Sequence, residues 1–151
     1  WITAHTKAVK CITVFNGHVY TGSNDNTIKG WLLFNPSDPD FKARDQCVRT
    51  LEGHTQTVTA LCTGDRFLIS ASSDAHVCLW NSNGQLECTL DGQKKGFTSL
   101  LYVQGYIFAG CDDKSIWVWD VGSKQRVDQL KKHTGWVHCL AELGGMVYSG
   151  S

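Results

Sequence analysis

The sequence lacks several features that would point to particular functions. Only 2 of its 151 residues are proline, and no apolar run approaches the roughly 18 residues of a membrane span. The first residues do not form a basic segment followed by an apolar one, so no secretory signal peptide is evident. Lys and Arg number 14 and Asp and Glu number 14, so the net charge is zero. This balance argues against a protein that coats nucleic acid or an anionic membrane.

The 7 cysteines also lack the spacing of a metal or redox site, because no Cys-x-x-Cys occurs. Most lie in apolar runs, such as residues 77–80, where a free cysteine packs as a small hydrophobic side chain. The odd number, together with the lack of a glycosylation sequon, favours a reducing intracellular compartment, cytoplasmic or nuclear. No cofactor or metal is expected.

Several residue types recur with one shared period. Asp25, Asp74 and Asp113 are 49 and 39 residues apart, and each lies six residues before a tryptophan: Trp31, Trp80 and Trp119. A His-Thr pair begins at His5, His54 and His133, and Gln93 takes the corresponding position in the third unit. The period predicts one domain, 1–151, with repeats at about 4–51, 52–90, 91–130 and 131–151, the last incomplete.

Each period has the pattern of four antiparallel strands. In the second unit the expected strands are residues 58–62, 67–72, 76–80 and 87–90. Asn16-Gly17, Asn83-Gly84, Gln104-Gly105 and Gly144-Gly145 supply residues that tolerate a positive φ in tight hairpins. No segment keeps a convincing helical period, so we expect an all-β fold. A four-stranded unit of about 40 residues is one blade of a β-propeller.

The motifs resemble those of the WD40-repeat family over the whole chain. The second unit has Gly53-His54, then Ser-Ala-Ser-Ser-Asp at 70–74, then Val-Cys-Leu-Trp-Asn at 77–81. The third unit ends in Trp119-Asp120, the dipeptide that gives the family its name. The resemblance implies an open arc of about three and a half blades. Because the chain starts without Met and stops inside a repeat, we expect the remaining blades to come from a longer chain, with a second copy as the alternative.

The repeated His, hydroxyl and Asp residues could suggest a hydrolase triad, but an enzyme needs one activated nucleophile and this set recurs. The resemblance implies instead a hydrogen-bond network within each blade, running from Asp through His and hydroxyl to the Trp indole. The implied network residues are His5, Asp25, Trp31, His54, Ser70, Ser72, Asp74, Trp80, Asp113, Trp119 and His133. Unit three has Ala109 and Cys111 in place of the hydroxyls, so its network is expected to be incomplete.

The resemblance also implies which residues face the central opening and contact partners. They lie near the start of each first strand and just before each aspartate. Besides Ala8 and Gly96, the positions are Lys10, Asn24, Thr57, Thr59, Ser73, Thr98, Asp112, Trp136 and His138. Trp136 stands out, because tryptophan is enriched at binding hot spots. The ten extra residues of unit one, around residues 34–41, contain both prolines and are expected to project from the opposite face.

We therefore expect a non-catalytic scaffold that binds a protein or peptide of unknown identity. One alternative is a substrate-recruiting module of a larger ubiquitin ligase or kinase. Another is an RNA-binding platform that uses lysines such as Lys94, Lys95, Lys131 and Lys132.

Overall fold

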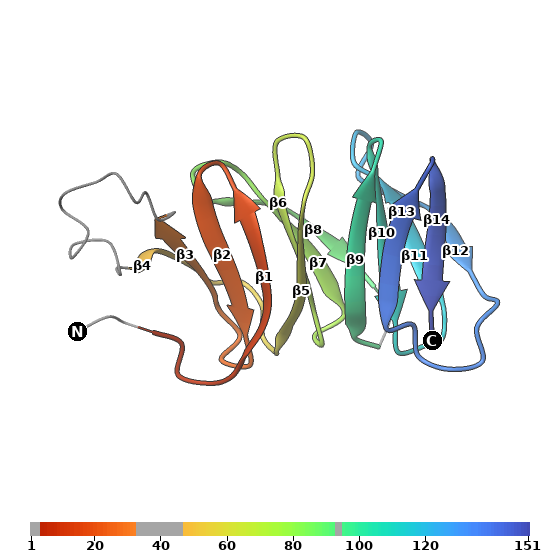
Figure 1. The fold of residues 1–151 in the computed structure, drawn as a ribbon, viewed down its shortest axis with the longest axis horizontal. Helices are drawn as coiled ribbons and strands as arrows, with labels where there is room; N and C mark the ends of the chain where they lie inside the picture. Colours follow the sequence, from red (N-terminus) through yellow and green to blue (C-terminus); the bar gives the residue numbers. More distant parts are fainter. Residues whose placement is uncertain (1–3, 33–46, 93–94) are drawn as a thin grey trace.

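A computed structural model describes residues 4–32, 47–92 and 95–151, all of it strands, turns and connecting segments (Figure 1). Three four-stranded antiparallel sheets are followed by a two-stranded hairpin. We number these sheets blade one to blade four. The strands are β1 (Val9–Phe15), β2 (His18–Ser23), β3 (Ile28–Leu32), β4 (Cys47–Leu51), β5 (Val58–Thr63), β6 (Leu68–Ser72), β7 (His76–Trp80), β8 (Leu86–Asp91), β9 (Phe97–Val103), β10 (Tyr106–Cys111), β11 (Ile116–Asp120), β12 (Gln125–Leu130), β13 (Cys139–Leu143) and β14 (Met146–Gly150).

The sheets stand side by side in an arc, as an unclosed β-propeller (Figure 1). Each sheet keeps sequence order, and the first strands β1, β5, β9 and β13 contact one another in turn. This architecture confirms the all-β propeller expected from the sequence. None of the described residues forms a helix, so none forms a helix that could cross a membrane.

The strands of all blades end on two opposite faces of the arc. One end, at the bottom of Figure 1, holds the β2–β3, β6–β7 and β10–β11 turns and the connections that enter each first strand. We call it the network face. The opposite end holds the β1–β2, β5–β6, β9–β10 and β13–β14 turns, and we call it the hairpin face. The segment 34–41, predicted to project from this second face, lies outside the described residues.

The short turns follow from residues that accept a left-handed backbone. Asn16-Gly17, Gln104-Gly105 and Gly144-Gly145 all have positive φ at both positions, which suits a two-residue antiparallel hairpin. Asn83-Gly84 differs, because only Gly84 has a positive φ, of 80°. The β7–β8 connection is longer and is held by the Asn81 side chain, whose Oδ1 accepts from the amides of Asn83 and Gln85.

The core lies between blades rather than within one of them. Between blades one and two, residues such as Tyr20, Ile28 and Leu51 pack against Leu68 and Trp80. Between blades two and three, a second cluster joins the apolar faces of β6 and β7 to those of β10 and β11. Trp117 and Trp119 belong to it and stack with ring centroids 5.8 Å apart. Each blade is therefore stabilised by its neighbours.

The two ends of the arc expose apolar side chains. In blade one, Ile12 is 67% exposed and Val14 is 53% exposed. In blade four, Leu143 is 72% exposed and Met146 is 60% exposed. A further groove, lined by Tyr106, Phe108, Val118, Val127 and Leu130 among others, lies on blade three. Surfaces of this kind, next to unpaired strand edges, favour association.

The 151-residue chain alone is expected to self-associate and to unfold at low temperature, because its terminal blades each lack a packing neighbour. Sedimentation velocity and a thermal melt of the chain would test this. A monodisperse monomer with a cooperative melt at high temperature would contradict the expectation.

Candidate functional site: the network face

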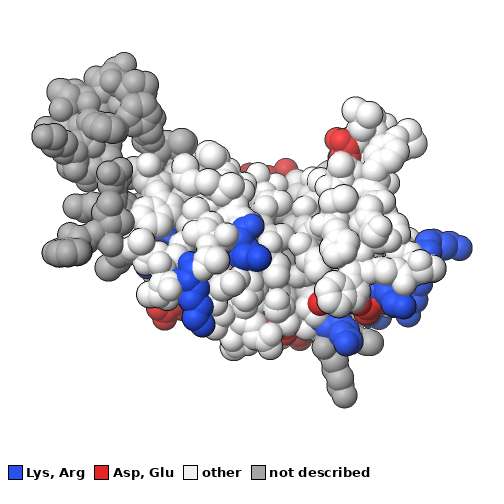
Figure 2. Space-filling model, turned by 60° about the horizontal axis from the view of Figure 1, so that its bottom comes forward, with Lys and Arg blue, Asp and Glu red and all other residues white. Residues whose placement is uncertain are grey.

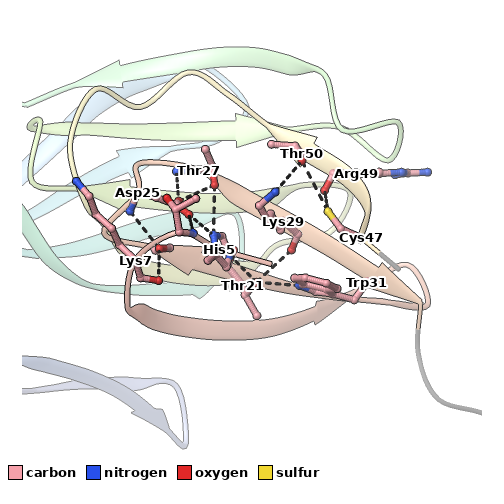
Figure 3. A network of polar contacts seen from close by, with 12 residues as sticks. His5, Lys7, Thr21, Asp25, Thr27, Lys29, Trp31, Cys47, Arg49 and Thr50 are labelled. Atoms are coloured by element: carbon pink, nitrogen blue, oxygen red, sulfur yellow. Dashed lines mark hydrogen bonds and ion pairs between the residues drawn. The ribbon is translucent and has the colours of Figure 1, made fainter. Parts of the chain in front are cut away.

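The network of blade one links a residue before β1, one on β2, one in the β2–β3 turn and one on β3 (Figure 3). His5 Nδ1 lies 2.8 Å from Asp25 Oδ2, and His5 Nε2 lies 2.8 Å from Thr21 Oγ1. The Trp31 indole donates to the same hydroxyl over 2.8 Å. Since a carboxylate only accepts, Nδ1 donates and Nε2 of the neutral ring accepts from the hydroxyl. The chain of bonds therefore satisfies every polar group in it.

Blade two repeats this geometry with a serine. His54 Nδ1 lies 3.0 Å from Asp74 Oδ2, while His54 Nε2 and the Trp80 indole each lie 2.8 Å from Ser70 Oγ. Of the two serines proposed for this position, Ser70 is the one in the network. Ser72 instead accepts from the Asp74 amide and donates to the Gln56 carbonyl, so it shapes the turn.

Both aspartates are held ionised by this setting. Burial alone would raise the pKa of the Asp74 carboxyl, but hydrogen bonds from His54 and Thr55 outweigh it and hold the pKa well below its usual range. The pKa of Asp25 is lowered in the same way, with Thr27 and His5 among its donors. The residue after the aspartate has a positive φ in both blades, so each carboxylate caps a tight turn. These contacts fix the turns of the network face.

Blade three has a different network rather than a depleted one. The Asp113 carboxylate accepts from the Ser115 amide and hydroxyl, from the Trp117 indole at 3.1 Å and from Gln129 Nε2 at 3.2 Å. The sequence aligns Trp119 with Trp80, yet the indole that reaches the aspartate is that of Trp117. The chain of bonds from aspartate through a hydroxyl to the aligned tryptophan is thus not formed among the described residues of this blade, and β11 and β12 supply other donors to Asp113. Gln93 lies outside the described residues.

Blade four keeps the part of the network that its strands contain. His133 Nε2 lies 2.7 Å from Ser149 Oγ, which matches the contact of His54 with Ser70. His133 lies before β13 and Ser149 lies on β14, just as His54 lies before β5 and Ser70 lies on β6.

The residues predicted to contact partners gather on the network face, but they differ in exposure. Lys10, Ser73, Trp136 and His138 are exposed, and Ala8 is exposed beside them. Asn24, Thr57, Thr59, Thr98 and Asp112 are half-buried. Gly96 is buried, and a Cβ there would lie 2.8 Å from Ser73 Cα. Gly96 is therefore a packing position and not a contact residue. Figure 2, which brings this face forward, shows mostly uncharged atoms between separate basic side chains.

Two of the predicted contact residues use their hydroxyl groups inside the fold. Thr59 Oγ1 donates to the Phe97 carbonyl over 2.7 Å, and Thr98 Oγ1 donates to the Val137 carbonyl. The first bond joins β5 to β9, and the second joins β9 to the segment just before β13. The bulges that break register in β5 and β9 place these threonines toward the next blade. Sequence reasoning missed this role, for which the only signal was a threonine at the same repeat position.

An aromatic pair lies where blades three and four meet. Trp136 is 56% exposed, and its ring centroid lies 6.3 Å from that of His138. The Val137 amide donates to the Cys111 carbonyl at 3.3 Å, which ties the residue after Trp136 to the residue before Asp112. One oxygen of Asp112 is buried without a hydrogen-bond partner among the described residues. This junction combines a large exposed ring with an acidic group.

The repeated sheets and their networks agree with a comparison against protein families. The model described as "WD domain, G-beta repeat" matches residues 2–31, 45–81 and 84–120. The chain belongs to the WD40-repeat family. A human relative, pre-mRNA-processing factor 17, is 29% identical over 149 residues, which are 91% of this chain and 24% of that protein. The F-box/WD repeat-containing protein sel-10 of Caenorhabditis elegans is 28% identical over 105 residues, 68% of this chain and 17% of that protein.

The WD40 arc also resembles solved structures. The crystal structure of the computationally designed Ika4 protein superposes with a TM-score of 0.83 and 27% identity, covering 100% of this chain and 89% of that one. The designed Ika8 protein gives the same TM-score, and the arc covers 45% of its chain. The arc spans only about a quarter, or less, of the curated relatives described above.

Proposed function

We propose that this WD40 arc is part of a non-catalytic scaffold that binds a protein or peptide on its network face. The observation that carries the proposal is Trp136, a large aromatic side chain that is 56% exposed on a face held rigid by buried networks. Exposed tryptophans beside polar groups are typical of binding hot spots. Members of this family act generally as protein-interaction scaffolds.

The networks support a positioning role rather than catalysis. His54 and Asp74 have side chains that are 1% and 3% exposed, and the bonds that start at the aspartate end at a tryptophan indole. No substrate could reach the Ser70 hydroxyl, which accepts from that indole, without opening the blade. The same argument applies to His5 and Asp25, whose side chains are 3% and 8% exposed.

A second candidate function is recruitment of substrates for a larger enzyme. It is favoured by the relatives sel-10, an F-box/WD repeat-containing protein, and myosin heavy chain kinase C of Dictyostelium discoideum, which is 30% identical over 138 residues. The network face would serve as the docking surface in this case too, so the same residues would contact the substrate. RNA binding has weaker support, since the net charge is zero.

Trp136→Ala is expected to weaken binding of the partner by about 2 kcal/mol or more, as truncation of hot-spot aromatics does. Lys10→Glu and Asp112→Lys should act mainly through the association rate and its salt dependence. The measurement is calorimetry or surface plasmon resonance with a purified partner and the complete propeller.

Substitutions within residues 36–41 are the matched control, because that loop was predicted to lie on the other face. If they abolish binding while Trp136→Ala does not, the partner does not use the network face. The proposed site would then be wrong, although the fold would stand.

A further inference from the structure

A cavity of about 410 Å³ opens on the hairpin face, between blades two and three. Three turns form it: the β5–β6 turn with Asp65 and Arg66, the β9–β10 turn with Gly105, and the β11–β12 turn with Lys124. Phe67 and Tyr102 complete much of its wall. The volume falls within the range of small-ligand sites, which is about 300–1,000 Å³.

The cavity is held in shape by bonds between its turns. The Tyr102 hydroxyl donates to Asp65 Oδ2 over 2.8 Å, which ties blade three to blade two. The Val121 amide donates to the Gly105 carbonyl over 2.9 Å, which ties the two turns of blade three together. Gly64 is needed for this packing, because a Cβ there would lie 3.0 Å from the Tyr102 ring. The site is therefore preformed.

The charged groups of the cavity differ in the bonds that they form among the described residues. Asp65 accepts from Tyr102, and Asp120 Oδ1 accepts from the Ser123 amide at 2.6 Å and its hydroxyl at 2.7 Å. The Arg66 guanidinium lies over the Phe67 ring, 4.8 Å from its centroid. Within the part of the chain that the structure describes, neither Arg66 nor Lys124 forms a salt bridge. Each carboxylate thus has one oxygen engaged within the protein, while Arg66 and Lys124 supply the two cationic donors of the cavity.

We propose that this cavity binds a carboxylate side chain of an acidic peptide. Arg66 is the principal donor, because a guanidinium can bond both oxygens of a carboxylate and its stacking on Phe67 orients it. Lys124 adds a second positive charge, and Val121 offers apolar surface to the methylene groups of the ligand. Asp65 and Asp120 lower the positive potential of the rim. They favour a singly charged carboxylate over a doubly charged phosphate.

The probe is a short fluorescein-labelled peptide with two glutamates around one leucine, titrated with the full-length protein and followed by fluorescence anisotropy. Binding should weaken at least about tenfold in Arg66→Gln, since a charge-assisted hydrogen bond is lost. It should weaken less in Lys124→Gln. Asp65→Asn should tighten binding, because the amide oxygen still accepts from Tyr102 while the repelling charge is gone.

Two controls separate this site from the network face and from general charge effects. Lys10→Gln removes one exposed positive charge on the network face. Trp136→Ala removes the proposed hot spot on the same face. Neither substitution should alter binding of the probe. The matched peptide with glutamines should bind at least about tenfold more weakly. Equal binding of the two peptides, or an unchanged affinity in Arg66→Gln, would overturn the proposal. Tighter binding of a phosphoserine peptide than of the glutamate peptide would overturn the choice of ligand.

Discussion

Trp80→Ala is expected to destabilise blade two by about 3–5 kcal/mol, the usual loss when a buried tryptophan is truncated. Trp80 is 2% exposed and packs in the cluster that joins blades one and two. Its indole also donates to Ser70 Oγ. The substitution thus opens a cavity between blades and leaves the Ser70 hydroxyl with one hydrogen-bond partner fewer. Native-state amide hydrogen exchange of the complete propeller would measure the loss blade by blade.

Trp80→Phe separates the two contributions. It keeps much of the apolar contact but removes the indole N–H, so the loss should be smaller than for alanine, at about 1–3 kcal/mol. If both variants lost the same amount, packing between the blades would contribute little. If the loss spread evenly over all blades, the interblade account of the core would be wrong.

Asp74→Ala and Asp113→Ala should each destabilise their own blade by about 1–3 kcal/mol, because each strands buried donors. In blade two the stranded donors are those of His54 and Thr55. In blade three they include the Trp117 indole, whose side chain is 1% exposed. An incomplete network in unit three, as expected from the sequence, would by itself make the loss at Asp113 the smaller of the two. The donors found around Asp113 remove the reason for that difference.

The same hydrogen-exchange measurement checks this pair. Asp113→Asn is a useful intermediate, because its amide oxygen can still accept from Trp117 or Ser115. A loss in Asp113→Ala far below that in Asp74→Ala would mean that the bonds from β11 and β12 contribute little to blade three.

The fold could be predicted from the sequence because the repeat fixes it many times over. The first three units repeat the same spacing of aspartate and tryptophan, and strand alternation with hairpin residues supplies the rest. Asn16-Gly17 and Gly144-Gly145 adopt the expected turns. Asn83-Gly84 does not, because the Asn81 side chain organises a longer connection there. A dipeptide alone does not determine the length of a loop.

The details of the sites were harder to foresee, because they depend on contacts between repeats. Position in the repeat aligns Trp119 with Trp80. The hydroxyls are replaced in this unit, and Asp113 accepts instead from Trp117 and Gln129 of its own sheet. Thr59 and Thr98 are polar residues near a surface, and only the bulges of their strands show that they bond to the next blade. The hairpin-face cavity combines turns from two blades, which no single repeat contains.

The restriction of packing to neighbouring blades has a consequence for how such a chain can change over evolutionary time. The main contacts between sheets join β1 and β2 to β5, β5 and β6 to β9, and β9 and β10 to β13. A duplicated or deleted repeat would therefore meet surfaces of a kind that already fit it. Genes for such chains can gain or lose whole units by recombination, while a turn such as β5–β6 can diverge in one unit without disturbing the rest.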